Sequence, residues 1–344
     1  MTTLYSDIDH VHQPDDDPHW QESFVLVFRD LDSDLVGFLR LGSYVNQGQS
    51  QTHFGLALPD GTRFRRHRLD LPYDPAGRSR DRLQVGPLSW AIHEDHIHVT
   101  GTEDEAEVDV RLYDFFPSQN WRIADPMGAE IAKGVGGMNH PESSGRIKGR
   151  VRLGDRVIDI ANGLFHRDHA WGPRVHIDFL NNRWIAGTVG PELSFSCMTL
   201  QRGDGNFFKA AWVVRDGVVE YAQDVNTAAI VLADGLSTIG GFTEIILDSG
   251  ERIVIETEVI DGIITSTHQP NGGPGSSPAG VEALAKARWN GLEGFCDFNI
   301  NINPLHGEAA VTRLLHANHS DGLTKHEPDT VAWAYRIRNE LKAQ

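Results

Sequence analysis

The chain has 344 residues, and 48 acidic against 31 basic side chains give it a formal net charge of −17. This excess of negative charge disfavours nucleic acid and anionic membrane surfaces as main partners, because both would be repelled at ordinary salt. Hydrophobic residues make up 40% and charged residues 23% of the chain, so it is not intrinsically disordered, and its length suits about two domains.

The first twenty residues are polar and acidic, with Asp15, Asp16 and Asp17 in a row, and they lack the apolar core of a secretory signal. No stretch of about 18 apolar residues predicts a membrane-spanning helix. The two cysteines, Cys197 and Cys296, are too few for a disulfide framework or a zinc ribbon, although they could form one bridge. We therefore expect a soluble, cytoplasmic protein without membrane insertion.

In the first half of the chain, short runs of alternating apolar and polar residues are bounded by turn residues, which predicts β-strands. One turn, Pro59-Asp60-Gly61, has the composition of a hairpin. The predicted strands are 24–28, 36–41, 53–58, 63–69, 92–100, 107–112, 147–153 and 156–160.

The second half repeats this pattern with predicted strands at 184–189, 195–200, 209–214, 218–221, 228–232, 242–247 and 252–259. Helical periodicity is scarce: residues 281–287 and 331–341 predict two short helices, and 270–278 has the composition of a flexible loop. Strands spaced by 8–12 residues are typical of sandwiches and barrels. We expect an all-β protein of two similar units, residues 1–178 and 179–344.

Familiar cofactor and metal motifs are missing: the sequence has no GxGxxG after a strand, no phosphate-binding GxxxxGK[ST] and no HExxH. The densest histidine cluster contains His93, His96 and His98, whose imidazoles could bind a metal ion. A turn followed by a solvent-exposed strand is the favoured interpretation of this cluster. We expect no metal and no cofactor.

The segment 165–174 combines five ionisable residues and a tryptophan directly after an apolar run. On an extended strand, His166 and Asp168 point one way while His169 and Trp171 point the other, so Asp168 could face the interior of a barrel. A carboxyl group in an apolar cavity has a raised pKa and can act as a general acid, with a neighbouring imidazole as base. The alternative is structural: Asp168 pairs with Arg174 or caps the turn.

Further candidates lie elsewhere in the chain. Glu22 has the same parity as Phe24 and could be an inward carboxylate, and Tyr44 and His53 could converge near it. The segment around Trp289 again combines tryptophan with carboxylates, among them Asp297. Each of these is more often structural than catalytic.

The run from Ser144-Gly145-Arg146 to Arg167-Asp168-His169-Ala170-Trp171-Gly172-Pro173-Arg174 resembles the signature of bacterial tandem-lipocalin proteins, with Ala170 where serine is usual. These proteins are related to carotenoid 1,2-hydratase and AttH-like proteins, and more distantly to fungal calycin-type Diels–Alderases. The segments 20–24 and 289–294 resemble the opening and a late strand of the same group.

This resemblance implies two tandem lipocalin- or calycin-like antiparallel β-barrels with an apolar pocket in one barrel or between them. It also implies a cofactor-independent hydratase, dehydratase or isomerase acting on a hydrophobic terpenoid- or steroid-like molecule. A homodimer is compatible with the sequence. Asp168, His166, His169 and Glu22 would be catalytic and Arg174 and Gly172 structural, while substrate would contact Tyr44, His53, Trp171, Trp184 and Trp289. The alternatives are a shape-driven cyclase and a non-catalytic carrier of lipophilic molecules.

Overall fold

The computed structural model describes residues 5–121, 139–174, 179–202, 207–231, 238–266 and 279–302. These residues form an all-β protein, which confirms the predicted fold class. The helices among them are three short 3-10 turns, Asp7–Asp9, Val45–Gln47 and Pro75–Gly77. The helix predicted at 281–287 is wrong, because these residues belong to a strand that pairs on both sides. The loop predicted at 270–278 and the helix predicted at 331–341 lie outside the described residues.

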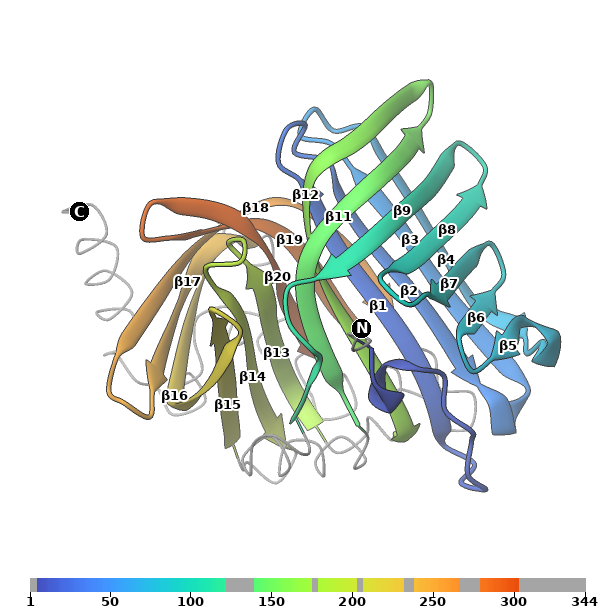
Figure 1. Cartoon of the computed structure of the whole chain (residues 1–344), viewed down its shortest axis with the longest axis horizontal. Coiled ribbons are helices and arrows are strands. Elements are labelled where there is room, and N and C mark those ends of the chain that lie inside the picture. Colours follow the sequence, from blue (N-terminus) through green and yellow to red (C-terminus); the bar gives the residue numbers. More distant parts are fainter. Residues whose placement is uncertain are drawn as a thin grey trace.

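The N-terminal half forms a twelve-stranded, curled sheet in the order β4-β3-β2-β1-β12-β11-β9-β8-β7-β6-β5, with β10 paired to β11 (Figure 1). It stays open, because no ladder joins its edge strands β4 and β5 among the described residues. The strands are β1 (Trp20–Asp30), β2 (Val36–Tyr44), β3 (Gln49–Ala57), β4 (Arg63–Pro72), β5 (Arg78–Ser79), β6 (Arg82–Val85), β7 (Leu88–Ile92), β8 (Ile97–Glu103), β9 (Ala106–Asp114), β10 (Gln119–Asn120), β11 (Pro141–Leu153) and β12 (Arg156–Pro173).

The second half forms a closed, antiparallel eight-stranded barrel in sequential order. Strand β20 closes it by pairing with β13. Its strands are β13 (Phe179–Thr188), β14 (Ser194–Arg202), β15 (Phe207–Arg215), β16 (Val218–Val231), β17 (Thr238–Leu247), β18 (Arg252–Ser266), β19 (Ala279–Trp289) and β20 (Leu292–Ile302). Cys197 and Cys296 both lie buried in this barrel, and neither forms a disulfide bond.

Burial along the strands explains where the two units meet. Strand β9 alternates between buried and exposed residues, as expected for a strand with one face in water, whereas every residue of β1 and β2 is buried. One face of β1 and β2 packs on the core inside the curled sheet, which includes Phe24 and Leu39. The other face packs against the outside of the barrel, where Val25 and Phe38 join Phe295 in one cluster.

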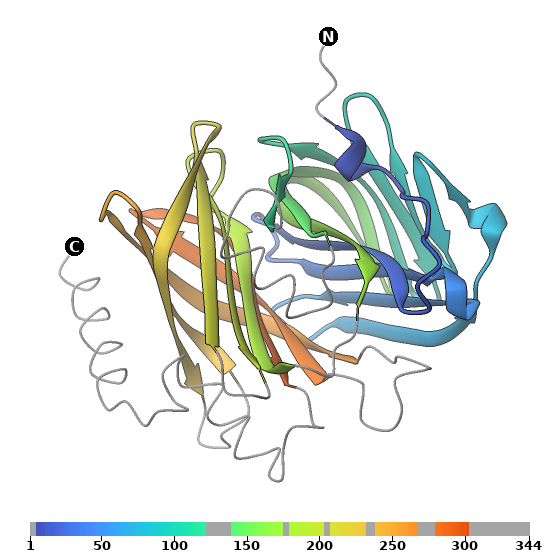
Figure 2. The same ribbon diagram turned by 90° about the horizontal axis from the view of Figure 1, so that it is seen from below.

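The two units lie side by side (Figures 1 and 2) and are joined by polar contacts as well as apolar ones. The buried guanidinium of Arg29 on β1 donates to the carbonyl of Gly294 at 2.6 Å and to Glu293 at 2.7 Å. The first sheet ends at Pro173 and the barrel begins at Phe179. We propose residue 178 as the boundary between two domains.

Before the first strand, residues 5–19 form an N-terminal segment that lies along the open side of the curled sheet (Figure 2). The backbone of Val11 donates to Arg80, and Tyr5 contributes to the core inside the sheet. Among the described residues, no helix is long and apolar enough to cross a bilayer.

Candidate active site between the two units

Strand β12 carries the charged segment identified in the sequence, and its alternation sends successive side chains to opposite faces of the curled sheet. Pairing with β1 places Trp171 opposite Glu22 and His169 opposite Phe24, on the inner face. Asp168 and His166 therefore face outward, toward the barrel. The predicted alternation is confirmed, but the expectation that Asp168 faces the interior of the first unit is wrong.

A buried polar cluster surrounds Asp168 at this junction. His140 Nε2 lies 3.1 Å from Asp168 Oδ2 and 3.3 Å from Glu142 Oε1. His166 Nε2 lies 3.4 Å from the second oxygen of Glu142, and its Nδ1 is hydrogen-bonded to Ser144 Oγ at 2.8 Å. The other oxygen of Asp168, Oδ1, is buried and makes no hydrogen bond to the described part of the chain. It is therefore available to accept a proton or a hydrogen bond.

Two tryptophans join this cluster from different elements. Trp184 on β13 and Trp121, which follows β10, both donate their indole N–H to Glu142 Oε1, at 2.9 and 2.6 Å. The predicted residue Trp184 thus belongs to the site. Because Trp184 comes from the barrel, the second unit completes a cluster to which the first unit contributes Asp168 and Glu142.

The barrel also contributes a pair of carboxyl groups, Asp297 on β20 and Glu282 on β19. Asp297 has the same parity as Phe295, which packs in the cluster between the units, so its side chain leaves the barrel on that side. Asn299 donates its side-chain amide to Glu282. Asp297 is fully buried, in a place where a carboxylate lacks water to stabilise its charge.

The pKa values of the titratable groups in this site are shifted in opposite directions. Burial would lower the pKa of His140, but the charges of Asp168 and Glu142 outweigh it and raise that pKa. Burial would raise the pKa of Asp168, but His140, Arg174 and His166 lower it, opposite to the predicted raised value. Burial, Glu282 and the charge of Asp168 raise the pKa of Asp297 well above its usual range. The two carboxyl groups are therefore shifted apart: burial and acidic neighbours favour the protonated form of Asp297, whereas basic neighbours favour the ionised form of Asp168.

A second polar cluster lies inside the curled sheet. The predicted residues Glu22 and His169 meet there, with His169 Nε2 at 3.0 Å from Glu22 Oε1. His12 Nδ1 lies 3.2 Å from the same oxygen, and Arg78 forms an ion pair with the other oxygen at 2.6 Å. Trp171 stacks on the ring of His12, with the ring centroids 3.7 Å apart. The four predicted catalytic residues thus form two pairs on opposite faces of the sheet.

Burial opposes ionisation in this inner cluster, and charge partners decide the outcome. Burial would raise the pKa of Glu22, but hydrogen bonds from His12 and His169 and the charge of Arg78 lower it to about 2. Burial lowers the pKa of His169 despite the neighbouring carboxylate.

The remaining predicted residues lie apart from Glu22. The Tyr44 hydroxyl is hydrogen-bonded to Arg40 and Gln51, and His53 contacts His67 with their Nδ1 atoms 2.7 Å apart. The expected convergence of Tyr44 and His53 on Glu22 is wrong, because they lie on the outward face. Trp289 packs against the core of the barrel.

The two residues expected to be structural lie at the end of β12. Arg174 is half-buried near Asp168, and loss of water around it together with the charge of Arg40 lowers its pKa to about 10. Gly172 has φ of +114°, a conformation that favours glycine. The structural role of these two residues stays a prediction.

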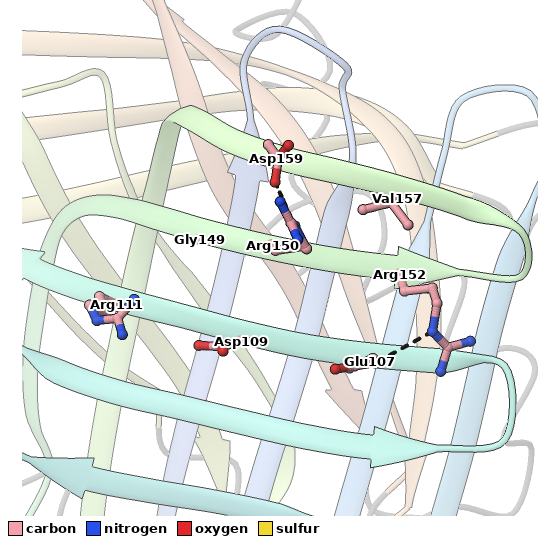
Figure 3. A pocket seen from close by; sticks show the side chains of 8 residues that line it. All are labelled: Glu107, Asp109, Arg111, Gly149, Arg150, Arg152, Val157 and Asp159. Atoms are coloured by element: carbon pink, nitrogen blue, oxygen red, sulfur yellow. Dashed lines mark hydrogen bonds and ion pairs between the residues drawn. The ribbon is translucent and has the colours of Figure 1, made fainter.

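Two surface features contain many charged groups. In the cluster of His93, His96 and His98, His96 pairs with Asp95 and His98 with Asp109, at the predicted exposed position. A shallow hollow of about 570 Å³ crosses strands β9, β11 and β12 (Figure 3). Two of its arginines pair with its own carboxylates, Arg150 with Asp159 and Arg152 with Glu107, so it has the character of a solvated strand face.

Sequence reasoning missed His140, Glu142 and Glu282, and it named Asp297 without a role. Glu142 precedes the Ser144-Gly145 element, which is a weak sequence signal. Asp297 is 129 positions from Asp168 in the sequence, so no local spacing connects them.

Comparison with known proteins finds a matching family and several solved structures that are similar to this chain. The model of the family described as domain of unknown function DUF7064 matches residues 6–304. An AttH-like protein from Nitrosomonas europaea is similar with a TM-score of 0.61 and 11% identity, covering 87% of this chain and 96% of that one. No curated protein sequence matches the chain.

Two further solved structures share the fold. CghA, which has also been crystallised with Sch210972, gives a TM-score of 0.60 at 14% identity and covers 85% of this chain and 90% of its own. Kievitone hydratase from Nectria haematococca gives 0.55 at 10% identity, with coverages of 82% and 88%. At these identities the likeness shows the fold alone, whereas the family match spans most of the sequence. The chain belongs to the DUF7064 family.

Proposed function

We propose that the protein is a hydratase or dehydratase that acts by acid–base catalysis at the junction of its two β units. The observation that carries this proposal is the buried carboxyl of Asp297, whose pKa the charge of Asp168 helps to raise, at the same junction as the ion pair of Asp168 and His140. Two carboxyl groups held in opposite protonation states supply an acid and a base at one pH. Kievitone hydratase, whose name describes hydration, has the same fold.

In the dehydration direction, Asp297 gives its proton to the substrate hydroxyl, the C–O bond breaks and water leaves. Asp168 Oδ1 then accepts the proton from the neighbouring carbon, and the electron pair of that C–H bond forms the C=C bond. The proton returns from Asp168 to Asp297 through water, so no external reactant is consumed. Hydration is the reverse sequence.

The charge that develops on carbon defines the substrate class. Trp184 and Trp121 provide aromatic faces, which stabilise cations, beside the negative charge of the cluster. Apolar residues surround these rings, including Phe116 and Met198. We infer a hydrophobic, terpenoid- or steroid-like alcohol or alkene whose carbocation is tertiary or allylic.

The test is oxygen exchange. Purified protein is incubated in H₂¹⁸O with a panel of hydrophobic tertiary and allylic alcohols, and ¹⁸O incorporation is followed by mass spectrometry. We expect exchange by the wild type and by the exposed-turn control Asp248→Asn, with a loss of about 10²–10⁴-fold in Asp297→Asn and Asp168→Asn. Wild-type exchange that persists in both site variants would overturn the proposal.

A shape-driven cyclase is the second candidate, because CghA has this fold and has been crystallised with Sch210972. Holding two reacting ends together needs no proton donor. Turnover of a polyene that is independent of pH and tolerates Asp297→Asn would favour the cyclase. A co-purifying molecule that is recovered unchanged, with no turnover of either panel, would favour a carrier.

A further inference from the structure

The cluster inside the curled sheet has the composition of a metal site. It contains two imidazoles and one carboxylate, from His12, His169 and Glu22, and their ligand atoms all lie within 4.8 Å of one another. In the described part of the chain, these three residues are the one group of histidine, cysteine or acidic side chains whose ligand atoms lie this close together. None of the three takes part in the function proposed for the other face of the sheet.

We propose that His12, Glu22 and His169 bind one divalent transition-metal ion, which clamps the N-terminal segment onto strands β1 and β12. Each ligand comes from a different one of these three elements. The ion would therefore join residues that are far apart in the chain and close the open side of the curled sheet.

The spacing of the donor atoms fits one coordination sphere. Ligands about 2.1 Å from a metal ion lie roughly 3.0–3.4 Å from each other at tetrahedral or octahedral angles. Glu22 Oε1 lies 3.0 Å from His169 Nε2 and 3.2 Å from His12 Nδ1. The carboxylate would bind through this one oxygen, because Arg78 pairs with the other.

The orientation of His169 points to a cation. Its Nδ1 lies 2.9 Å from the carbonyl oxygen of Ile8, and a carbonyl only accepts, so Nδ1 carries the hydrogen. Its Nε2 points at Glu22 Oε1 from 3.0 Å, a position in which either a metal ion or a proton can join the two atoms. Metal-binding histidines are commonly fixed by such a hydrogen bond from the second ring nitrogen.

The other ligands are held in place as well. The ring of His12 is stacked on Trp171, with an interplanar angle of 8°, and its backbone N–H donates to Glu22 Oε1. Glu22 and His169 are fully buried, so little rearrangement accompanies binding. Two imidazoles and a carboxylate suit Zn²⁺ and neighbouring first-row ions such as Co²⁺.

The test uses the full-length protein, freed of metal with EDTA and then titrated with Zn²⁺ by calorimetry and with Co²⁺ by visible absorption. We expect one ion per chain and a rise in the melting temperature on adding Zn²⁺. Substituting His169→Gln or His12→Ala should weaken binding at least about tenfold and abolish the thermal shift. His12 is half-buried on the N-terminal segment, so its variant keeps the test valid if His169→Gln fails to fold.

The matched control is His96→Asn in the exposed histidine cluster, which should bind Zn²⁺ as the wild type does. Failure of the folded wild type to bind Zn²⁺ would mean that a proton, not a metal ion, bridges Glu22 and His169. Binding lost in His96→Asn and kept in His12→Ala would assign the ion to the surface cluster. Either result overturns the proposal and leaves the oxygen-exchange test unaffected.

Discussion

At the residue scale, the site depends on three groups whose protonation is set by their neighbours. Asp168 is charged because His140 stands beside it, and Asp297 is neutral because burial, Glu282 and Asp168 all oppose its charge. The sequence pointed to Asp168 and to the alternation around it. The sequence could not predict the protonation of Asp168, because His140 lies 28 positions away and Asp297 lies in the other unit.

Asp297→Asn should change stability in a pH-dependent way. The folded pKa of Asp297 lies above its unfolded value, so its contribution to stability falls as pH rises from that unfolded value through the folded pKa. The variant lacks this loss and should gain on the wild type as pH rises above the unfolded value of about 3.9, by at most about 1.4 kcal/mol per pH unit. Urea unfolding at several pH values measures this. A difference that does not change with pH would mean that Asp297 is ionised.

His140→Gln tests the ion pair between His140 and Asp168 by removing the histidine. The pKa of His140 is raised in the folded protein, so its stabilising effect is full below the unfolded value near 6.5 and disappears as pH rises through the folded pKa. We expect the variant to be less stable than the wild type below about pH 6 and to approach it in alkaline solution. An unfolding deficit that grows with pH would contradict the pairing with Asp168.

At the element scale, strand β12 contributes to two polar clusters on opposite faces of the sheet, because its side chains alternate. Period-2 reasoning predicted which residues share a face, since it depends on local geometry alone. It could not predict which face meets the barrel, because β12 is covered on both sides. The predicted helix at 281–287 failed for a related reason: its run of small apolar residues faces the barrel core as a strand, with Ala283, Ala285 and Ala287 inward.

Strand β11 must pass close to β9 to place Glu142 in the site, and Gly145 allows this approach. A Cβ at Gly145 would lie 2.1 Å from the Tyr113 carbonyl oxygen and 2.7 Å from the ring of Phe165. Gly145→Ala should therefore lower the free energy of unfolding by about 1–3 kcal/mol. Gly154→Ala, at a turn with φ of +61° and open space, should lower it by only about 1 kcal/mol. Chemical denaturation measures the free energy of unfolding of both variants. An equal loss in the two would show that β11 and β9 are not tightly packed at Gly145.

At the scale of the whole molecule, the site exists only while the curled sheet and the barrel stay together. Composition and strand spacing predicted an all-β protein with two units, because these depend on many residues at once. The contact between the units depends on pairs such as Arg29 and Gly294, which are separated by most of the chain. No sequence pattern predicts such pairs.

Arg29→Met should weaken this contact. It leaves the Gly294 carbonyl without its donor, which costs about 1–3 kcal/mol, and thermal unfolding should separate into two transitions. The control Lys286→Met removes the partly exposed pair with Asp34 at 2.7 Å and should cost less than about 1 kcal/mol. Calorimetry compares the thermal unfolding transitions of the two variants. A single, unshifted transition in Arg29→Met would show that the units are held by apolar contacts alone.

The central claim is that one buried aspartic acid holds its proton at neutral pH beside an ionised partner. Carbon-13 NMR of protein labelled at the aspartate carboxyl carbons measures this directly across a pH titration. We expect one carboxyl signal that stays protonated at about pH 7 and disappears in Asp297→Asn, while the Asp168 signal stays ionised down to acid pH. If every aspartate is ionised at neutral pH, or if the protonated signal survives in Asp297→Asn, the acid–base site is not the one described.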